Sequence, residues 1–204
     1  MAVPRGAVPD TALLDRADAI LAWGAPAGLL ARRDEGAQPL AAFLAGLDTP
    51  GAPPRVPGTA VYLTGQREVV PTALALNLRH NGVLHEAVAL LHVRAERVPR
   101  VAEAERVTVA ELGDGVRDVT VRFGFAEAPD VPAALRLHRR EAGPDPDAAS
   151  FFLGREVPVP SMRPELKAWE EPLFVFLTRN AVRAPDYFRI LPPRVVELGT
   201  RVEL

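Results

Sequence analysis

Residues 55–94, RVPGTAVYLTGQREVVPTALALNLRHNGVLHEAVALLHVR, decide the fold of this chain. The short apolar run 60–64 stands between Pro57-Gly58 and the polar turn 65–68, a pattern that is typical of a buried strand. Pro71 suits the first position of a following helix, because its ring fixes φ and the missing N–H costs no hydrogen bond there.

The second half of this stretch predicts another strand. Asn81-Gly82 ends the helix, since glycine readily takes the left-handed conformation that closes many helices. Residues 87–93 are then almost continuously apolar, as in a strand that is buried on both faces. We therefore predict a βαβ unit in which the two strands are parallel.

Composition limits the class of protein. The 204 residues are 48% hydrophobic and 25% charged, with no cysteine, which indicates a globular chain without disulfides or thiolate metal sites. The net charge of −2 gives no electrostatic footprint for nucleic acid, so we expect no nucleic-acid partner. The uncharged run 19–31 is too short and too broken by glycine and proline to span a bilayer, and we expect a cytoplasmic, soluble chain.

We predict two regions. Residues 1–54 form a helical leader that contains two short helices, the second over Leu40, Phe43, Leu44 and Leu47, and that ends in a proline-rich linker. Residues 55–204 form the compact domain. Its predicted class is α/β, with a mixed β-sheet that the βαβ unit opens, that contains a β-hairpin and that helices cover.

Further elements follow along residues 98–204. Residues 98–105 read as an extended connector, and 107–125 as a hairpin with one dry and one wet face around Gly113-Asp114-Gly115. The other predictions are a helix that Asp130 caps, a strand over 151–159 with Pro158 near its end, a long helix over 161–177 that Pro172 kinks, and a terminal strand over 196–204.

Patterns that carry catalysis or metal binding are weak. His80, His85 and His92 are not spaced as ligands on one helix face, and His85-Glu86 lacks the second histidine of a zinc-protease helix. The chain has no glycine-rich phosphate loop and no serine in a nucleophile elbow. We therefore expect no catalytic residue, metal or cofactor, and no enzyme.

One polar group remains of interest, where the predicted helix ends and the second strand begins. It lies opposite the carboxyl ends of the strands, where open α/β sheets usually bind ligands. Helix capping and surface exposure are the simpler interpretation, because asparagine and glycine often end helices. The group consists of Asn77, Arg79, His80, Asn81 and His85.

Several segments, in order, resemble one family. They are QPLAAFLAGL (38–47), PRVPGTAVYLT (54–64), NLRHNGVLHEAVALLHVRAERVPRV (77–101), EAPDVPAAL after RFGF (122–135), SFFLGRE (150–156), FLTRNA (176–181) and YFRILPPRVVELGTRVEL (187–204). Together they resemble the C-terminal cytosolic domain of the Kup (KUP/HAK/KT) potassium uptake transporters, from about residue 38 to residue 204.

The resemblance implies a regulatory or scaffolding domain of a K⁺/H⁺ symporter, on the cytosolic face of the cell membrane, without the membrane part that transports the ion. It also implies a homodimer and, in some bacterial relatives, inhibition by cyclic di-AMP. A stand-alone sensor that binds such a nucleotide is the alternative. Arginine and amide groups suit phosphate and base edges, so the candidate ligand residues are Asn77, Arg79, His80, Asn81, His85, Arg155 and Arg179.

Overall fold

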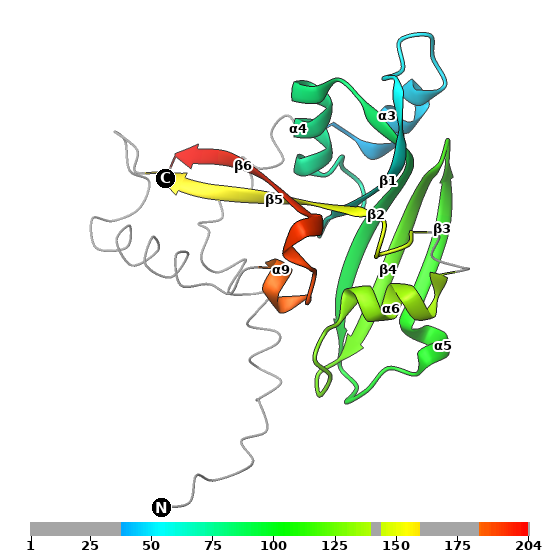
Figure 1. Cartoon of the computed structure of the whole chain (residues 1–204), viewed down its shortest axis with the longest axis vertical. Coiled ribbons are helices and arrows are strands. Elements are labelled where there is room, and N and C mark those ends of the chain that lie inside the picture. The colour runs from blue at the N-terminus through cyan, green and yellow to red at the C-terminus, as the bar shows by residue number, and fades with distance from the viewer. Residues whose placement is uncertain (1–37, 140–143, 160–183, 204) are drawn as a thin grey trace, which may run out of the picture.

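The predicted βαβ unit forms the centre of the fold, as β1 (Arg55–Leu63), α4 (Thr72–Asn81) and β2 (Leu84–Glu96). β1 and β2 are parallel, with Tyr62 opposite Leu90, which confirms the prediction. The fold is seen in a computed structural model (Figure 1). The structure describes residues 38–139, 144–159 and 184–203.

Both ends of α4 follow from local sequence. Gly82 has φ of 67°, and its N–H donates to the Leu78 carbonyl at 2.9 Å, so the left-handed helix end is confirmed. Pro71 lies one position earlier than predicted, because it is the N-cap with ψ of 136° rather than the first helical residue. Its fixed φ still leads the chain into the helix.

The predicted hairpin is also present, as β3 (Val107–Gly113) and β4 (Val116–Gly124), which pair antiparallel. Asp114 and Gly115 have φ of 47° and 71°. A tight two-residue hairpin turn requires such positive φ values at both central residues. The expectation of a wet face on β4 is wrong, since Asp118 and Thr120 are buried.

The remaining elements complete a six-stranded sheet in the order β3-β4-β2-β1-β5-β6. All neighbouring strands except β3 and β4 are parallel, so the predicted mixed α/β class is confirmed. The carboxylate of Asp130 caps the helix before β5 and accepts from the Ala133 N–H at 2.9 Å. These elements are α6 (Val131–Leu137), β5 (Ser150–Val159), α9 (Ala184–Tyr187), the 3₁₀ turn η1 (Pro192–Arg194) and β6 (Val195–Glu203).

Two predictions about irregular positions have different outcomes. The connector 98–105 is not wholly extended, because α5 (Glu103–Arg106) begins inside it, where two glutamates in the first turn favour a helix. Pro158 lies one residue before the end of β5, opposite Val202, as predicted. β1 pairs with β5 only as far as Phe152, so Pro158 occupies a part of β5 that β1 does not reach.

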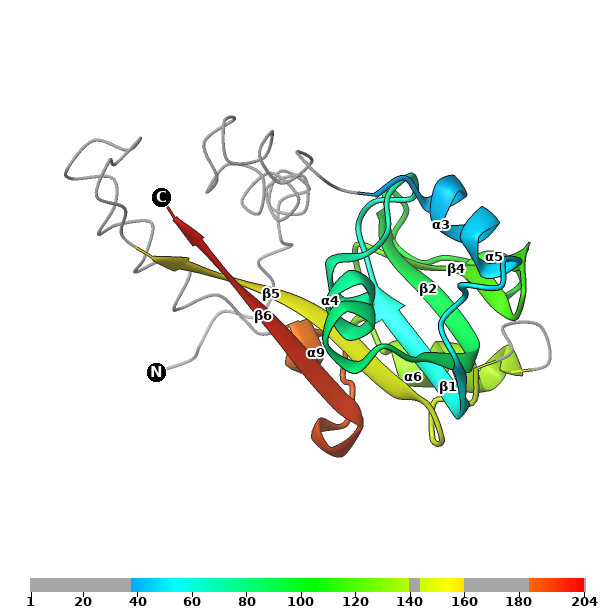
Figure 2. The same ribbon diagram turned by 90° about the horizontal axis from the view of Figure 1, so that it is seen from above.

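Both faces of the sheet are covered. Along each strand, neighbouring side chains point to opposite faces, and they join two separate hydrophobic clusters. One cluster packs under α6 and includes Val61 and Leu91, and the other packs under α4 and includes Tyr62 and Leu90. Figure 2 shows β5 and β6 running side by side away from the other strands.

The predicted helix around residues 40–47 is confirmed as α3 (Leu40–Leu47). Its Leu40, Phe43 and Leu47 are buried in the cluster under α4. The division of the chain at residue 55 stays a prediction. The first leader helix, the helix over 161–177 with its kink at Pro172, and Arg179 lie outside the described residues.

Candidate functional site

β1 and β5 are neighbours in the sheet, but the chain passes from β1 to β2 on one side and from β5 to β6 on the other, and this creates a topological switch point. α4 connects β1 to β2 across one face, whereas α6 leads from β4 to β5 across the other. β1 has β2 on one side and β5 on its other side. In open α/β sheets, ligands bind at the carboxyl ends of the strands at such a point.

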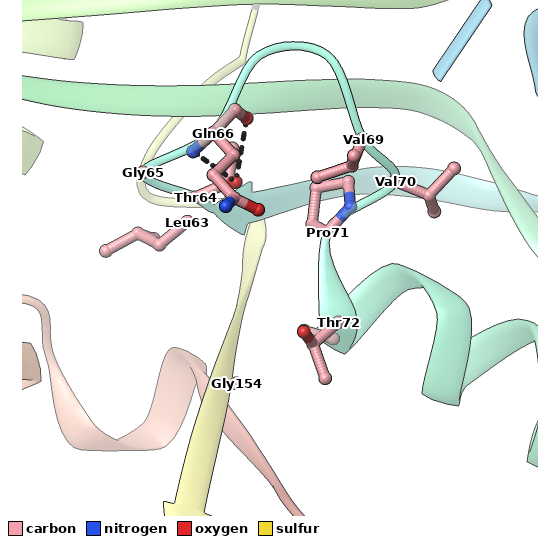
Figure 3. A pocket seen from close by; sticks show the side chains of 10 residues that line it. Leu63, Thr64, Gly65, Gln66, Val69, Val70, Pro71, Thr72 and Gly154 are labelled. Atoms are coloured by element: carbon pink, nitrogen blue, oxygen red, sulfur yellow. Dashed lines mark hydrogen bonds between the residues drawn. The ribbon is translucent and has the colours of Figure 1, made fainter. Parts of the chain in front are cut away.

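A pocket of about 110 Å³ lies there (Figure 3). It is lined by residues 63–66 at the end of β1, residues 69–73 at the start of α4, and Gly154 of β5. The Thr64 hydroxyl closes the turn, since it donates to the Gln66 carbonyl at 3.0 Å and accepts from the Gln66 N–H at 3.2 Å. Pockets for organic ligands usually enclose about 300–1,000 Å³, so this pocket is too small for a nucleotide.

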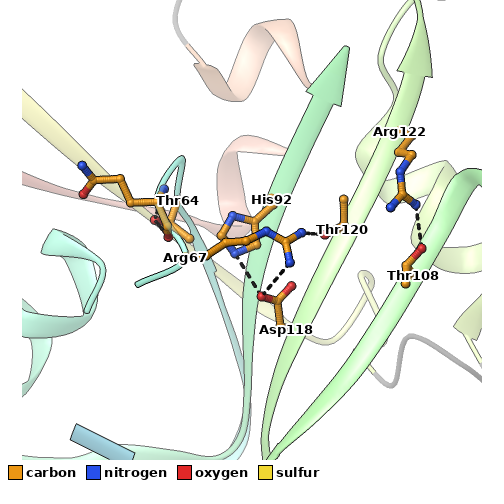
Figure 4. A network of polar contacts seen from close by, with 8 residues as sticks. Thr64, Arg67, His92, Thr108, Asp118, Thr120 and Arg122 are labelled. Atoms are coloured by element: carbon orange, nitrogen blue, oxygen red, sulfur yellow. Dashed lines mark hydrogen bonds and ion pairs between the residues drawn. The ribbon is translucent and has the colours of Figure 1, made fainter. Parts of the chain in front are cut away.

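Four polar side chains next to this pocket form what we call the Arg67 cluster: Arg67, His92, Asp118 and Thr120 (Figure 4). Arg67 reaches from the β1–α4 loop, where its guanidinium lies 3.4 Å from Asp118 Oδ2 and also donates to the Thr120 hydroxyl. His92 Nε2 lies 3.5 Å from the same Asp118 oxygen. The cluster therefore ties the loop to β2 and β4.

Burial differs strongly within the Arg67 cluster. The His92 side chain is 4% exposed and that of Asp118 is 12% exposed, whereas Arg67 is 43% exposed. Burial lowers the pKa of His92, Asp118 opposes that shift, and the nearby cations Arg67 and Arg94 add to it. The histidine is therefore held mainly neutral beside a carboxylate and an arginine.

The predicted ligand residues on α4 lie near the amino ends of β1 and β2. They are thus at the other end of these strands from the switch-point pocket. Asn77 is buried, and its amide donates to the Val83 carbonyl at 3.0 Å. The Asn81 amide donates to Asn77 Oδ1 at 2.8 Å. These bonds satisfy carbonyl and amide groups around the end of α4, as the capping interpretation predicts. Arg79 and His80 are exposed on the last turn of the helix.

The other predicted residues are dispersed. His85 packs edge-on against Phe152, with ring centroids 5.7 Å apart, and burial lowers its pKa. Arg155 projects from β5, is 57% exposed and lies 3.6 Å from Glu197. Asn77 and Asn81 are thus the two predicted residues that a described hydrogen bond brings together.

Sequence reasoning missed two structural arginines. Arg55 donates to the His85 carbonyl at 2.9 Å and to the Asp114 carbonyl at 2.8 Å, and so it joins β1, β2 and the hairpin turn. The sequence pattern places Arg67 only in a polar turn. The available signal was the placement of Asp118 and Thr120 two residues apart between valines, which indicates polar groups that need partners.

A partly buried ion pair lies beyond the carboxyl end of β4. The Arg106 guanidinium donates to Glu127 Oε1 at 2.6 Å. Glu127 Oε2 accepts from the Gly124 N–H at 2.6 Å and the Val101 N–H at 3.1 Å. The hydrogen bond from Arg106 lowers the pKa of Glu127 to about 2, and the two backbone N–H groups assist. This carboxylate has a structural role.

No group of three or more His, Cys, Asp or Glu side chains is arranged to hold a metal ion in the part of the chain that the structure describes. Among those same residues, no helix is long and apolar enough to cross a membrane.

Comparison with known proteins points to transporters. Residues 57–204 match the family described as the K⁺ potassium transporter C-terminal domain. A probable potassium transport system protein Kup 1 of Paramagnetospirillum magneticum is 46% identical over 185 residues, which is 89% of this chain and 29% of that protein.

Two further relatives, both described as probable potassium transport system protein Kup, give the same picture. The protein of Pseudomonas aeruginosa is 47% identical over 86% of this chain and 28% of its own length. That of Myxococcus xanthus is 49% identical over 74% of this chain and 23% of its own length. The chain thus spans less than a third of the relatives that it matches. No solved structure matches it.

Proposed function

The chain belongs to the Kup family of potassium transporters, whose C-terminal domain it contains, and on that premise we propose that it regulates or scaffolds transport rather than conducting K⁺ itself. The match to the C-terminal domain over residues 57–204 is the observation that carries this proposal. A regulatory domain acts through a conformational equilibrium that is coupled to another part of the protein.

The structure offers a suitable element for such regulation. The β1–α4 loop lies at the switch point, borders the pocket and is held to the sheet through the partly exposed Arg67. A surface ion pair contributes only about 0–1 kcal/mol, so small changes in charge would shift the loop between held and released states. A rigidly buried anchor would not respond in that way.

We place the domain on the cytosolic side of the membrane, with the membrane part of a Kup-like transporter as its partner, and in a homodimer. Sedimentation of the 204-residue chain tests the dimer. A mass twice that of one chain at micromolar concentration would support it, whereas a monomer at all concentrations up to about 100 μM would contradict it.

The transport proposal is tested with the Pseudomonas aeruginosa relative in cells that lack other K⁺ uptake. One form lacks the C-terminal segment that matches this chain, and a second carries this chain in its place. We expect both forms to insert in the membrane and their uptake rates to differ. Equal uptake rates at equal amounts of protein would contradict a regulatory role.

A nucleotide sensor is the second candidate, and a larger hollow favours it. The hollow has a volume of about 670 Å³ and is lined in part by Glu96, Arg100 and Arg122. Arg122 pairs with Glu96 at 3.5 Å, so Arg100 is the lining arginine that suits a phosphate group. Calorimetric titration with cyclic di-AMP, ATP and AMP tests this function. Heat of binding that is seen with the unmodified chain and lost in Arg100→Gln would support the sensor function. The absence of binding heat with all three nucleotides would contradict it.

A further inference from the structure

His92 presents an unsatisfied nitrogen inside the Arg67 cluster. Its Nε2 is buried and, within the described residues, has no hydrogen-bond partner, although Asp118 Oδ2 is 3.5 Å away. Buried polar atoms without a partner are rare and call for an explanation.

The protonation state of the imidazole decides whether Nε2 can donate to Asp118. In neutral histidine only one ring nitrogen carries a proton. A neutral ring with its proton on Nδ1 has a lone pair on Nε2 and cannot donate to Asp118 from that atom. A second proton would turn Nε2 into a charge-assisted donor to Asp118 Oδ2.

The same carboxylate oxygen already holds Arg67, at 3.4 Å. A charged imidazolium would therefore repel the guanidinium and supply the same carboxylate oxygen with a better buried partner at nearly the same distance, 3.5 Å. Arg67 is 43% exposed and can turn into water, whereas His92 is fixed by its position on β2. Of the two cations, Arg67 is the one that can leave.

We propose that protonation of His92 releases Arg67 from Asp118 and loosens the β1–α4 loop, which makes the Arg67 cluster a proton-sensitive switch at the edge of the pocket. The charged groups that face His92 in the described structure are Asp118 of β4, Arg94 of β2 and Arg67 of the loop. Burial lowers the pKa of His92, so the switch operates below the ordinary range of histidine. The switch would serve the regulatory function proposed above, but its chemistry is tested without transport.

Hydrogen exchange of the 204-residue chain tests the release. Amides of residues 64–70 are followed at pH 7.5 and pH 5.0, with rates corrected for the intrinsic effect of pH. We expect exchange in this loop to rise about two- to fivefold at the lower pH, in line with loss of a partly exposed ion pair. His92→Gln should remove the rise, and His80→Gln, at an exposed site on α4, should preserve it. The proposal would be overturned if the exchange rates of the loop amides in the unmodified chain did not change with pH, or if folded His92→Gln showed the same rise.

A second measurement remains valid if His92→Gln does not fold. Proton binding at His92 and retention of Arg67 oppose each other, and this coupling is reciprocal. NMR titration of the imidazole should therefore show a higher pKa of His92 in Arg67→Gln. Asp118→Asn should lower that pKa, because it removes the anion. A pKa of His92 that stays unchanged or falls in Arg67→Gln would overturn the switch, whatever the outcome of transport assays.

Discussion

Arg106 and Glu127 form a partly buried ion pair, with the guanidinium 2.6 Å from Glu127 Oε1. The two side chains are 15% and 16% exposed, and the carboxylate also accepts from two backbone N–H groups. The pair joins α5 to the segment after β4, at the end of the sheet that carries the larger hollow.

Glu127→Gln should lower the free energy of unfolding by about 2 kcal/mol, because the amide cannot replace a charged acceptor of three donors. Urea unfolding followed by circular dichroism measures the loss. Glu103→Gln, at an exposed position of α5, is the matched control and should change stability by less than about 0.5 kcal/mol. Equal effects of the two substitutions would show that the ion pair contributes nothing.

The same carboxylate predicts a pH dependence with a definite sign. The pKa of Glu127 falls from 4.5 to about 2 on folding. The contribution of its carboxylate to the free energy of unfolding is therefore complete above pH 4.5 and is lost as the pH falls from 4.5 toward 2. The difference in unfolding free energy between the unmodified chain and Glu127→Gln should therefore shrink below pH 4.5. Urea titrations at pH 6, 4 and 3 measure it, and a difference that grows toward pH 3 would contradict the assignment.

Asn77 tests whether the polar group at the end of α4 caps the helix. Asn77→Ala leaves the Val83 carbonyl without its donor and should cost about 1–2 kcal/mol of unfolding free energy. Arg79→Gln and His80→Gln, on the exposed last turn, should each stay within about 0.5 kcal/mol. Thermal unfolding of the three variants decides the question, since capping predicts a loss for Asn77→Ala alone.

Two glycines give a paired test of close packing. A Cβ at Gly124 would lie 2.5 Å from backbone atoms of Val98 and Pro99, whereas one at Gly154 would lie 3.6 Å from Thr72 Cβ. Gly124→Ala must displace backbone and should cost about 2–4 kcal/mol. Gly154→Ala adds a methyl group beside the pocket and should stay within about 1 kcal/mol. Urea midpoints compare them, and equal losses would contradict the described packing.

Local patterns predicted much of this fold for identifiable physical reasons. The αL conformation of Gly82 and the turn at Asp114-Gly115 depend on residues that adjoin in sequence, and the buried strands show as apolar runs. The contact between Arg67 and Asp118 joins residues 51 positions apart on separate elements. Its formation depends on strand order and register, which no local pattern specifies.

The candidate site was harder to predict for the same reason. Asn77 and Asn81 were predicted as ligand residues because they cluster in sequence. In the structure their amides make hydrogen bonds at the end of α4. The switch point lies at the other end of β1, and it is defined by the placement of β5 beside β1. That pairing extends only over Ala60–Tyr62 with Ser150–Phe152, so it leaves little trace in the sequence.

The central claim, that this domain regulates transport and does not conduct the ion, is tested most directly by K⁺ uptake kinetics. The Pseudomonas aeruginosa relative is compared with and without this chain in place of its own C-terminal segment, at equal amounts in the membrane. We predict that the two forms share their preference for K⁺ over Na⁺ and differ at least twofold in maximal uptake rate. Identical rates, or an ion preference that changes with the domain, would contradict the claim.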